Sequence, residues 1–413
     1  MYPNGLESQF TYDTLNRVTA MNAAKASYSY TLSPTGNRTG AVESSGRTLN
    51  WSYDGIYRLT NETISLDPHS VNGSVSYGLD PVGNRQSQTS SIPGIATGSF
   101  TYDADDRLNT ETYDANGNTL VTGARTFTYD FENRLKTMTM GSATVSIVYD
   151  ADGNRVAKTV NGVTTRYLVD DLNPAGYAQV VEEVTNGAVT RQYTYGLQRI
   201  SQTQQIANAW TPSFYGYDGG GTVRLLTDST GTVTDTYDYD AWGNAVNITG
   251  STPNVYLYRG EQYDPDLSLY YLRARYLNPS TGRFLSRDPE AGRIKTPASL
   301  HKYLYAGGDP VNRVDPRGRL WSDYAELSSI SLESAAQIGS AALLTAKIVC
   351  GAELIYAAAA EIAKAGAHYG FSSDKEPLPA PPLWLDAACG LLLLPEALSA
   401  EWDKLLDLSG LFN

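Results

Sequence analysis

The stretch "NRVDPRGRLW" at residues 312–321 combines a carboxylate with turn-forming residues in the pattern Asp315-Pro316-x-Gly318. Asp-Pro and Pro-x-Gly are ordinary turn formers, so the stretch predicts a tight turn. A carboxylate can also take part in peptide hydrolysis, which needs one ionised group to activate water and one protonated group to polarise the carbonyl. Asp315 supplies only one of these groups, so cutting of the chain here requires a second carboxylate from elsewhere in the fold.

The composition of the chain changes at this seam. Residues 320–413 hold 12 acidic residues, four lysines and no arginine, whereas the whole chain carries a net charge of -13. Their Ala- and Leu-rich stretch, residues 331–370, has polar residues at multiples of seven and predicts helix. The longest charge-free run, residues 334–346, is shorter than the roughly 20 residues of a membrane span. Two interpretations remain for this tail: a small membrane-active or interaction toxin, or helices that pack on or inside the body.

The body before the seam consists of internal repeats. Units of two types alternate. The Tyr-Asp units are "YDTLNRV", "YDGIYRL", "YDADDRL" and "YDFENRL". The Gly-Asn-Arg units are "YTLSPTGNR", "YGLDPVGNR", "YDANGN" and "YDADGNR". β-branched and aromatic runs such as "TVSIVYD" lie between turn signals such as Asn161-Gly162. Each pair of units therefore predicts a β-hairpin, and the series predicts one continuous β-meander.

The repeated aspartates and tyrosines have structural explanations. Asp caps a turn through its carboxylate, and Gly or Asn allows a positive φ there. "DADGN" at residues 150–154 is not a calcium loop, because its Gly comes too early and no bidentate Glu follows. We expect neither a metal nor a cofactor. The 30 tyrosines against eight phenylalanines fit a thin sheet in which rings pack and hydroxyls stay hydrogen-bonded, although an aromatic surface could also bind sugars.

Charge and composition also bear on partners and compartment. The net charge of -13 and a pI of about 4.7 argue against nucleic acid as a partner, because phosphate contacts need clustered Lys and Arg. The cysteines, Cys350 and Cys389, both lie beyond the seam, and Cys350 falls within an apolar helical stretch that suits a core residue better than a nucleophile. "MYPNGLESQFTYD" has no basic region followed by an apolar one, so we expect no Sec-type signal peptide.

The densest motif of the chain is "YYLRARYLNPSTGRFLSRDP" at residues 270–289. With its surroundings, residues 222–318, it resembles the core domain of Rhs-repeat proteins. The upstream units are similar to the YD repeats of that family, of teneurins and of the C subunits of insecticidal Tc toxins. The resemblance implies a mainly β fold, a hairpin sheet wound into a complete or partial hollow shell with an α-helical tail. The predicted domains are the repeats at 1–221, blurred from about 157, the core domain at 222–319 and the variable tail at 320–413.

The resemblance also implies a self-cleavage site. Family members end their core domain in P-x4-D-P-x-G-L and cut directly after it, and this chain matches the motif with Pro310, Asp315, Pro316 and Gly318. The last position differs, since Arg319 stands in place of Leu, and the expected cut separates Arg319 from Leu320. The matching catalytic residues are Asp288 and Asp315 as the aspartyl pair, with Arg275 beside them.

The predicted function is a Rhs-type shell that encloses its own C-terminal tail as cargo and releases it by self-cleavage, in bacterial competition or secreted toxin delivery. Intramolecular cleavage is the only enzymatic activity expected. An immunity protein is an expected partner, together with a cell-surface glycan or a membrane for the tail. The expected location is cytoplasmic before delivery, then secreted or at the cell surface by a non-Sec route. The alternatives are a glycan-binding adhesin of YD repeats and a displaced cassette without an active toxin.

Overall fold

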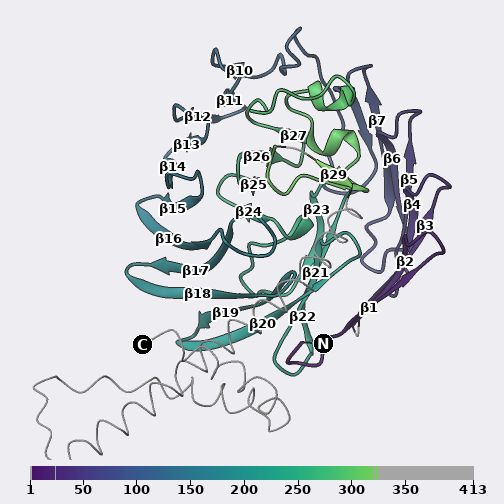
Figure 1. Cartoon of the computed structure of the whole chain (residues 1–413), viewed down its shortest axis with the longest axis vertical. Coiled ribbons are helices and arrows are strands. Elements are labelled where there is room, and N and C mark those ends of the chain that lie inside the picture. The colour runs from purple at the N-terminus through teal and green to yellow at the C-terminus, as the bar shows by residue number, and fades with distance from the viewer. Residues whose placement is uncertain (1, 24, 320, 324–413) are drawn as a thin grey trace, which may run out of the picture. The chain divides into compact units, whose positions relative to one another are not determined.

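The computed structural model describes residues 2–23, 25–319 and 321–323. The described residues belong to one compact unit, residues 1–331, which is built almost wholly of β-strands (Figure 1). This confirms the prediction of a mainly β protein. The predicted helices of the tail lie outside the described residues.

The first sheet has nine antiparallel strands in the order of the chain. Its strands are β1 (Ser8–Tyr12), β2 (Val18–Ala23), β3 (Ala26–Leu32), β4 (Arg38–Glu43), β5 (Thr48–Tyr53), β6 (Leu59–Ser65), β7 (Gly73–Leu79), β8 (Arg85–Ser90) and β9 (Gly98–Ser99). Each strand pairs with the one before it, as a series of short hairpins requires.

The second sheet continues the same pattern with fourteen strands, again in chain order. They are β10 (Thr112–Tyr113), β11 (Thr119–Thr122), β12 (Arg125–Tyr129), β13 (Leu135–Met140), β14 (Ala143–Tyr149), β15 (Arg155–Val160), β16 (Val163–Asp170), β17 (Gln179–Thr185), β18 (Ala188–Tyr195), β19 (Arg199–Ile206), β20 (Ala209–Tyr217), β21 (Val223–Thr227), β22 (Val233–Tyr239) and β23 (Ala245–Thr249). The predicted meander is therefore present, although a break between β9 and β10 divides it into two sheets. The repeat pattern fades in the sequence beyond residue 157, yet the hairpins continue through β16–β20.

A smaller part of the fold follows β23. It comprises a four-stranded sheet, a two-stranded hairpin and three short 3-10 helices. These are β24 (Gln262–Asp264), β25 (Leu269–Leu272), β26 (Arg275–Asn278), β27 (Arg283–Phe284), β28 (Arg313–Val314), β29 (Ser322–Asp323), η1 (Tyr258–Gly260), η2 (Pro297–Leu300) and η3 (Tyr305–Gly308).

The recurring aspartates cap the hairpin turns, as predicted. In the first turn Asp13 Oδ1 accepts the backbone N–H groups of Leu15 and Arg17, at 2.9 and 3.0 Å, and Asp13 Oδ2 accepts Arg17 Nε at 2.7 Å. In the same way, an aspartate accepts the N–H of the residue four positions later in the pairs Asp54–Arg58, Asp80–Asn84, Asp103–Arg107, Asp114–Asn118, Asp130–Arg134, Asp150–Asn154 and Asp240–Asn244. The carboxylates thus satisfy N–H groups that the ladder leaves unpaired.

A tyrosine beside several turns of the shell explains why the chain prefers Tyr to Phe. Its hydroxyl donates to a backbone carbonyl 14 to 18 positions earlier, which lies at the start of the hairpin before. This bond recurs in Tyr53 to Arg38, Tyr102 to Arg85, Tyr149 to Leu135, Tyr195 to Val180, Tyr217 to Arg199 and Tyr258 to Ala241. A phenylalanine would leave these carbonyls without that donor, so the hydroxyl ties successive repeats together.

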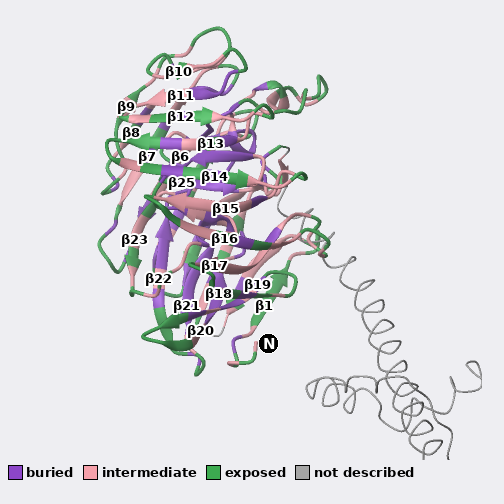
Figure 2. Cartoon of the chain, turned by 90° about the vertical axis from the view of Figure 1, so that its left-hand side faces the viewer, coloured by how far each residue is buried: buried purple, intermediate pink, exposed green. Residues whose placement is uncertain are grey.

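The two large sheets curve around the four-stranded sheet (Figure 1). Many strands of the large sheets alternate between buried and exposed residues, as β14 does, whereas β25 and β26 are buried throughout, as is β21 of the second sheet (Figure 2). Leu267, Leu269 and Tyr276 pack in one apolar cluster with Phe127 and Ile147 of the second sheet. One-sided burial explains the alternation of the outer strands, and burial on both faces explains the continuous apolar run of "LYYL".

Candidate functional site

The Asp-Pro-x-Gly stretch forms the loop of the hairpin between β28 and β29. Arg313 pairs with Asp323 and Val314 pairs with Ser322 in this hairpin. Gly318 N–H donates to the Asp315 carbonyl at 3.2 Å, so the stretch is a turn, as its sequence predicts. The turn presents Asp315 to Arg275, the first residue of β26.

The structure brings together the three residues predicted to be catalytic. Arg275 Nη2 lies 2.8 Å from Asp288 Oδ2 and 3.2 Å from Asp315 Oδ2. The side chains of Arg275 and Asp315 are almost fully buried, at 3% and 2% exposed, whereas that of Asp288 is 12% exposed. One guanidinium nitrogen therefore bridges two carboxylates, and solvent reaches the pair on the side of Asp288.

Burial sets the protonation of this pair. Burial raises the pKa of Asp315 and the pKa of Asp288 above the ordinary range, against the opposing charge of Arg275. The charge of Asp315 raises the pKa of Asp288 further. Two neighbouring carboxyls with raised pKa values favour a state in which one of them keeps its proton, and this is the state that acid and base catalysis by two carboxyls requires.

Three consecutive carbonyls of the loop are held by residues 273–275, which are the turn after β25 and the first residue of β26. The Pro316 carbonyl accepts from Arg273 Nη1, the Arg317 carbonyl from Ala274 N–H at 3.3 Å, and the Gly318 carbonyl from Arg275 Nε at 2.5 Å. Arg319 N–H donates to Asp315 Oδ1 at 2.9 Å. The backbone on both sides of Gly318 is therefore fixed against the aspartate pair.

Gly318 is required at its position for two reasons. Its φ is +63°, a left-handed conformation that costs other residues energy. A Cβ on this residue would also overlap the backbone carbonyl oxygen of Leu272 and come within 3.1 Å of Arg275 N. Only glycine lets the loop approach the end of β25 and the start of β26 this closely.

The other predicted residues of the motif occupy different places. The Pro310 carbonyl accepts from Arg259 and lies 3.0 Å from the Tyr258 hydroxyl, and these contacts anchor the chain before the hairpin. Arg319 is exposed to solvent, so the described loop accommodates a long cation where the family has an apolar residue. Leu320, the residue after the expected cut, lies outside the described residues.

Sequence reasoning missed Glu261 and Arg273. Glu261 is buried and binds Arg273 Nη1 through both carboxylate oxygens, at 3.0 and 2.9 Å. Burial raises the pKa of Glu261 against the charge of Arg273, and Asp315 adds to this rise. The signal in the sequence was the first arginine of "LRAR", two positions before Arg275, whereas nothing local marks Glu261.

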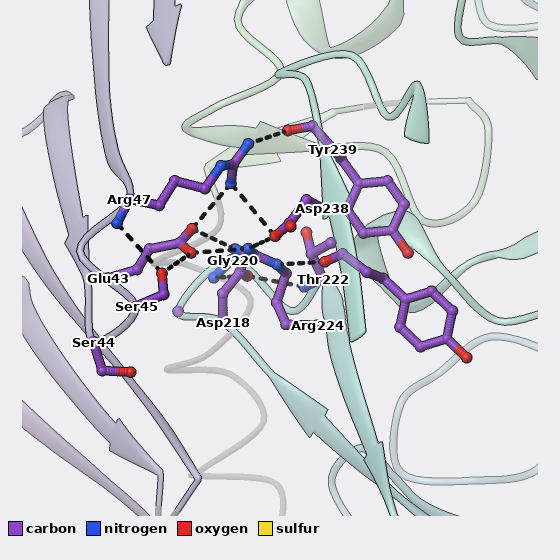
Figure 3. A network of polar contacts seen from close by, with 12 residues as sticks. Glu43, Ser44, Ser45, Arg47, Asp218, Gly220, Thr222, Arg224, Asp238 and Tyr239 are labelled. Carbon is purple, nitrogen blue, oxygen red and sulfur yellow. Dashed lines mark hydrogen bonds and ion pairs between the residues drawn. The ribbon is translucent and has the colours of Figure 1, made fainter. Parts of the chain in front are cut away.

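A second charged cluster joins the two large sheets (Figure 3). Arg224 on β21 donates to both oxygens of Glu43 on β4, at 2.8 and 3.1 Å, and pairs with Asp238 on β22 at 2.5 Å. Arg47 binds Glu43 at 3.1 Å and donates to the Tyr239 carbonyl at 3.2 Å. The cluster borders a cavity of about 70 Å³. Because both of its arginines are paired with carboxylates across the junction, we interpret it as structural.

The described residues lack two further features. Among residues 2–23, 25–319 and 321–323, no group of three or more His, Cys, Asp or Glu side chains is arranged to hold a metal ion. No helix within that part of the chain is long and apolar enough to cross a membrane.

The comparisons with known proteins agree with this architecture. A family model described as teneurin YD-shell matches residues 72–311. The tRNA nuclease WapA of Bacillus subtilis strain 168 is 34% identical over 368 residues, which cover 75% of this chain but 15% of that protein. The crystal structure of TcdB2-TccC3-Cdc42 has a similar fold, with a TM-score of 0.64 at 18% identity, over 81% of this chain and 19% of that chain. The crystal structure of TcdB2-TccC3 without its hypervariable C-terminal region gives the same TM-score at 18% identity, over 76% of this chain and 18% of that chain.

The fold therefore defines a shell built from YD repeats, with an acidic pair at the seam after its smaller sheet. The chain belongs to the teneurin YD-shell family, as the match over residues 72–311 shows. This confirms the expected relationship to YD-repeat and Rhs proteins. The chain spans about 15% of the length of the first curated relatives it matches. The predicted boundaries at residues 221 and 319 stay predictions, since residues 1–331 form one compact unit.

Proposed function

We propose that this chain is the shell of a toxin carrier and that it cuts its own backbone between Arg319 and Leu320, which separates the C-terminal segment from the shell. The observation that carries the proposal is the contact of one nitrogen of Arg275 with both Asp288 and Asp315. A pair of buried carboxylates beside a loop that sequence marks as a cleavage seam is the arrangement that aspartyl-protease chemistry needs.

In the proposed reaction, the ionised aspartate of the pair takes a proton from a water molecule. The water oxygen forms a bond to the carbonyl carbon of Arg319, while the protonated aspartate polarises the carbonyl oxygen of that residue. Arg275 stabilises the negative charge that develops. The bond from that carbon to the nitrogen of Leu320 then breaks, the nitrogen takes up a proton, and Arg319 ends in a carboxylate. Atoms and charges balance without a metal or cofactor.

The class of cargo follows from the relatives. The name of WapA describes a tRNA nuclease, and the TccC3 chain of the solved structures has a hypervariable C-terminal region. We propose that residues 320–413 are the corresponding cargo, a toxin segment that the shell withholds until delivery out of the cell. An immunity protein that binds this segment in the producing cell is part of the proposal.

The proposal is tested by the mass of the purified full chain under denaturing conditions. The wild-type chain is expected to yield a fragment that begins at Leu320, whereas Asp315→Asn and Asp288→Asn stay intact, because one carboxyl cannot serve as both acid and base. Asp130→Asn is the matched control, since Asp130 caps a hairpin turn and its loss leaves the pair in place. Arg319→Leu, which restores the family residue, is expected to be cut at least as fast as the wild type.

A wild-type chain that remains whole, together with a whole Arg319→Leu chain, would show that the motif is only a turn. A fragment that begins at Arg319 would instead place the cut at the Gly318–Arg319 peptide, whose carbonyl and N–H contact Arg275 and Asp315. The self-cleavage would then stand and the assigned bond would be wrong.

A further inference from the structure

Arg273 connects the seam loop to two other parts of the fold. It lies in the turn between β25 and β26 with a φ of +58°, two positions before Arg275. Its Nη1 donates to the Pro316 carbonyl and to both oxygens of Glu261, and its Nε donates to the Ala178 carbonyl at 3.1 Å. Its guanidinium carbon lies 4.1 Å from the ring centre of Tyr177. A single side chain thus holds the residue after Asp315 against the loop between β16 and β17.

The loop between β16 and β17 also contacts the seam directly. Arg317 Nη2 donates to the Gly176 carbonyl at 2.7 Å. Asn173 shapes the loop, because its Nδ2 donates to the carbonyls of Asp170 and Tyr177, at 2.7 and 2.9 Å, and its Oδ1 accepts Ala175 N–H at 3.0 Å. Residues 173–178 therefore form an ordered platform, supplied by the large sheet, on which the seam rests.

The contacts of Arg273 also bear on the charge around the aspartate pair. Glu261 is 8% exposed, and its carboxylate is close enough to Asp315 to raise its own pKa through that charge. Without Arg273, this third carboxylate would be buried beside the pair with no cation bound to it, which is strongly destabilising. Arg273 thus fixes the seam loop and also neutralises Glu261, the acidic residue beside the aspartate pair.

From these contacts we propose that Arg273 is a positioning residue for the cleavage and that residues 173–178 must be in place before the seam is cut. The inference rests on the proposed self-cleavage and adds a condition to it. Displacement of a reacting group by about 1 Å can slow a reaction on the order of a hundredfold. A seam that depends on a loop between β16 and β17 is cut only after that part of the large sheet has folded, so the cargo is separated from a formed shell and not from a nascent chain.

The test follows the rate of cleavage of the full chain in cell-free translation, by intact mass at successive times. Arg273→Met is expected to slow the cut by roughly tenfold or more. Arg273→Lys is expected to recover part of the rate, because an ammonium can still bind Glu261 and reach the Pro316 carbonyl. Asn173→Ala, which loosens the platform without touching Glu261 or the aspartate pair, is expected to slow the cut about threefold or more.

Arg191→Met is the matched control for loss of a half-buried arginine, because Arg191 pairs with Glu183 at 3.5 Å and donates to Gln204 and to the Pro253 carbonyl, none of which belongs to the seam or to residues 173–178. Its rate of self-cleavage is expected to stay within about twofold of the wild-type rate. This holds even if Arg191→Met lowers the thermal unfolding midpoint as much as Arg273→Met does. Equal rates for Arg273→Met and wild type, or equal losses in Arg191→Met and Arg273→Met, would overturn the positioning role. Equal rates for Asn173→Ala and wild type would overturn the dependence on the platform. An uncut wild-type chain would instead remove the self-cleavage, and this inference with it.

Discussion

At the scale of single residues, the seam is built from groups that each serve structure and chemistry together. Arg275 neutralises the buried Asp315 and holds the Gly318 carbonyl at 2.5 Å, so the residue that tunes the carboxyls also fixes the loop. Gly318 contributes no functional group at all. Its contribution is the absence of a side chain, which lets the loop lie against the backbone of Leu272 and Arg275.

The role of Gly318 can be separated from ordinary backbone strain. Gly187 has a φ of +78° but open space around it, so Gly187→Ala is expected to lower the free energy of unfolding by about 1 to 2 kcal/mol through strain alone. Gly318→Ala adds the overlap with Leu272 and is expected to cost more and to slow the cut. Chemical denaturation and intact mass measure the two effects. Equal losses of stability with unchanged cleavage would mean that the close approach is unimportant.

At the scale of the element, one turn design recurs through the shell with small variations. The residue before the Arg has a positive φ in the turns that contain Asn16, Asp106 and Asn133, and Asn and Asp tolerate this conformation. In the second Tyr-Asp unit, Tyr57 occupies this position with a φ of +67° and is 43% exposed. The second Tyr-Asp unit therefore carries backbone strain at Tyr57, which the other units reduce by having Asn or Asp at this position.

Replacement of Tyr57 by Asn is expected to stabilise the protein by about 1 kcal/mol, because the strain is relieved and little buried surface is lost. Ile56→Asn provides the control, since Ile56 is adjacent and exposed but is not among the residues with positive φ. It is expected to change the free energy of unfolding by less than about 0.5 kcal/mol. The measurement is urea denaturation of both variants beside the wild type. A loss of stability in Tyr57→Asn would show that the tyrosine ring contributes more than the strain costs.

At the scale of the whole described unit, buried polar groups join sheets that are distant in sequence. Glu62 on β6 accepts Trp51 Nε1 at 3.0 Å and the N–H of Ala241, in the turn between β22 and β23, at 2.8 Å. Burial and the neighbouring Asp240 raise the pKa of Glu62 to about 7. The first sheet is therefore linked to the end of the second through a carboxyl that binds a proton more tightly when the chain is folded.

This linkage fixes the sign of a pH effect. A carboxyl with a raised pKa stabilises the fold below its unfolded pKa of about 4.5, and this contribution is lost as the pH rises through about 7. Between these values the free energy of unfolding of the wild type is expected to fall, relative to Glu62→Gln, by up to about 3 kcal/mol. Chemical denaturation at several pH values measures this difference in the free energy of unfolding. Glu132→Gln is the control for loss of an exposed carboxyl. A difference between wild type and Glu62→Gln that is constant with pH would contradict the assignment.

The repeats could be predicted from the sequence because their signals are local. A turn between two strands is specified within a few residues by Asp, Gly and Asn, and the alternation of apolar and polar residues specifies which face of each strand is buried. The aspartate caps, the hairpins and their order along the chain all follow from such short-range patterns. The break between β9 and β10 could not be predicted from these patterns, because it depends on which strands pair by hydrogen bonds in the folded protein.

For the seam, the sequence by itself determined the turn at Asp315-Pro316-x-Gly318, and the family resemblance singled out Asp288 and Arg275. Only the tertiary structure decided that both aspartates meet one nitrogen of Arg275, that burial raises their pKa values, and that Glu261 and the loop at residues 173–178 support them. The physical reason is that protonation and positioning depend on burial and on contacts between residues far apart in the chain, such as Arg317 and Gly176, which are 141 positions apart. Spacing along the chain carries no information about such contacts, and the packing of the smaller sheet inside the larger ones creates them.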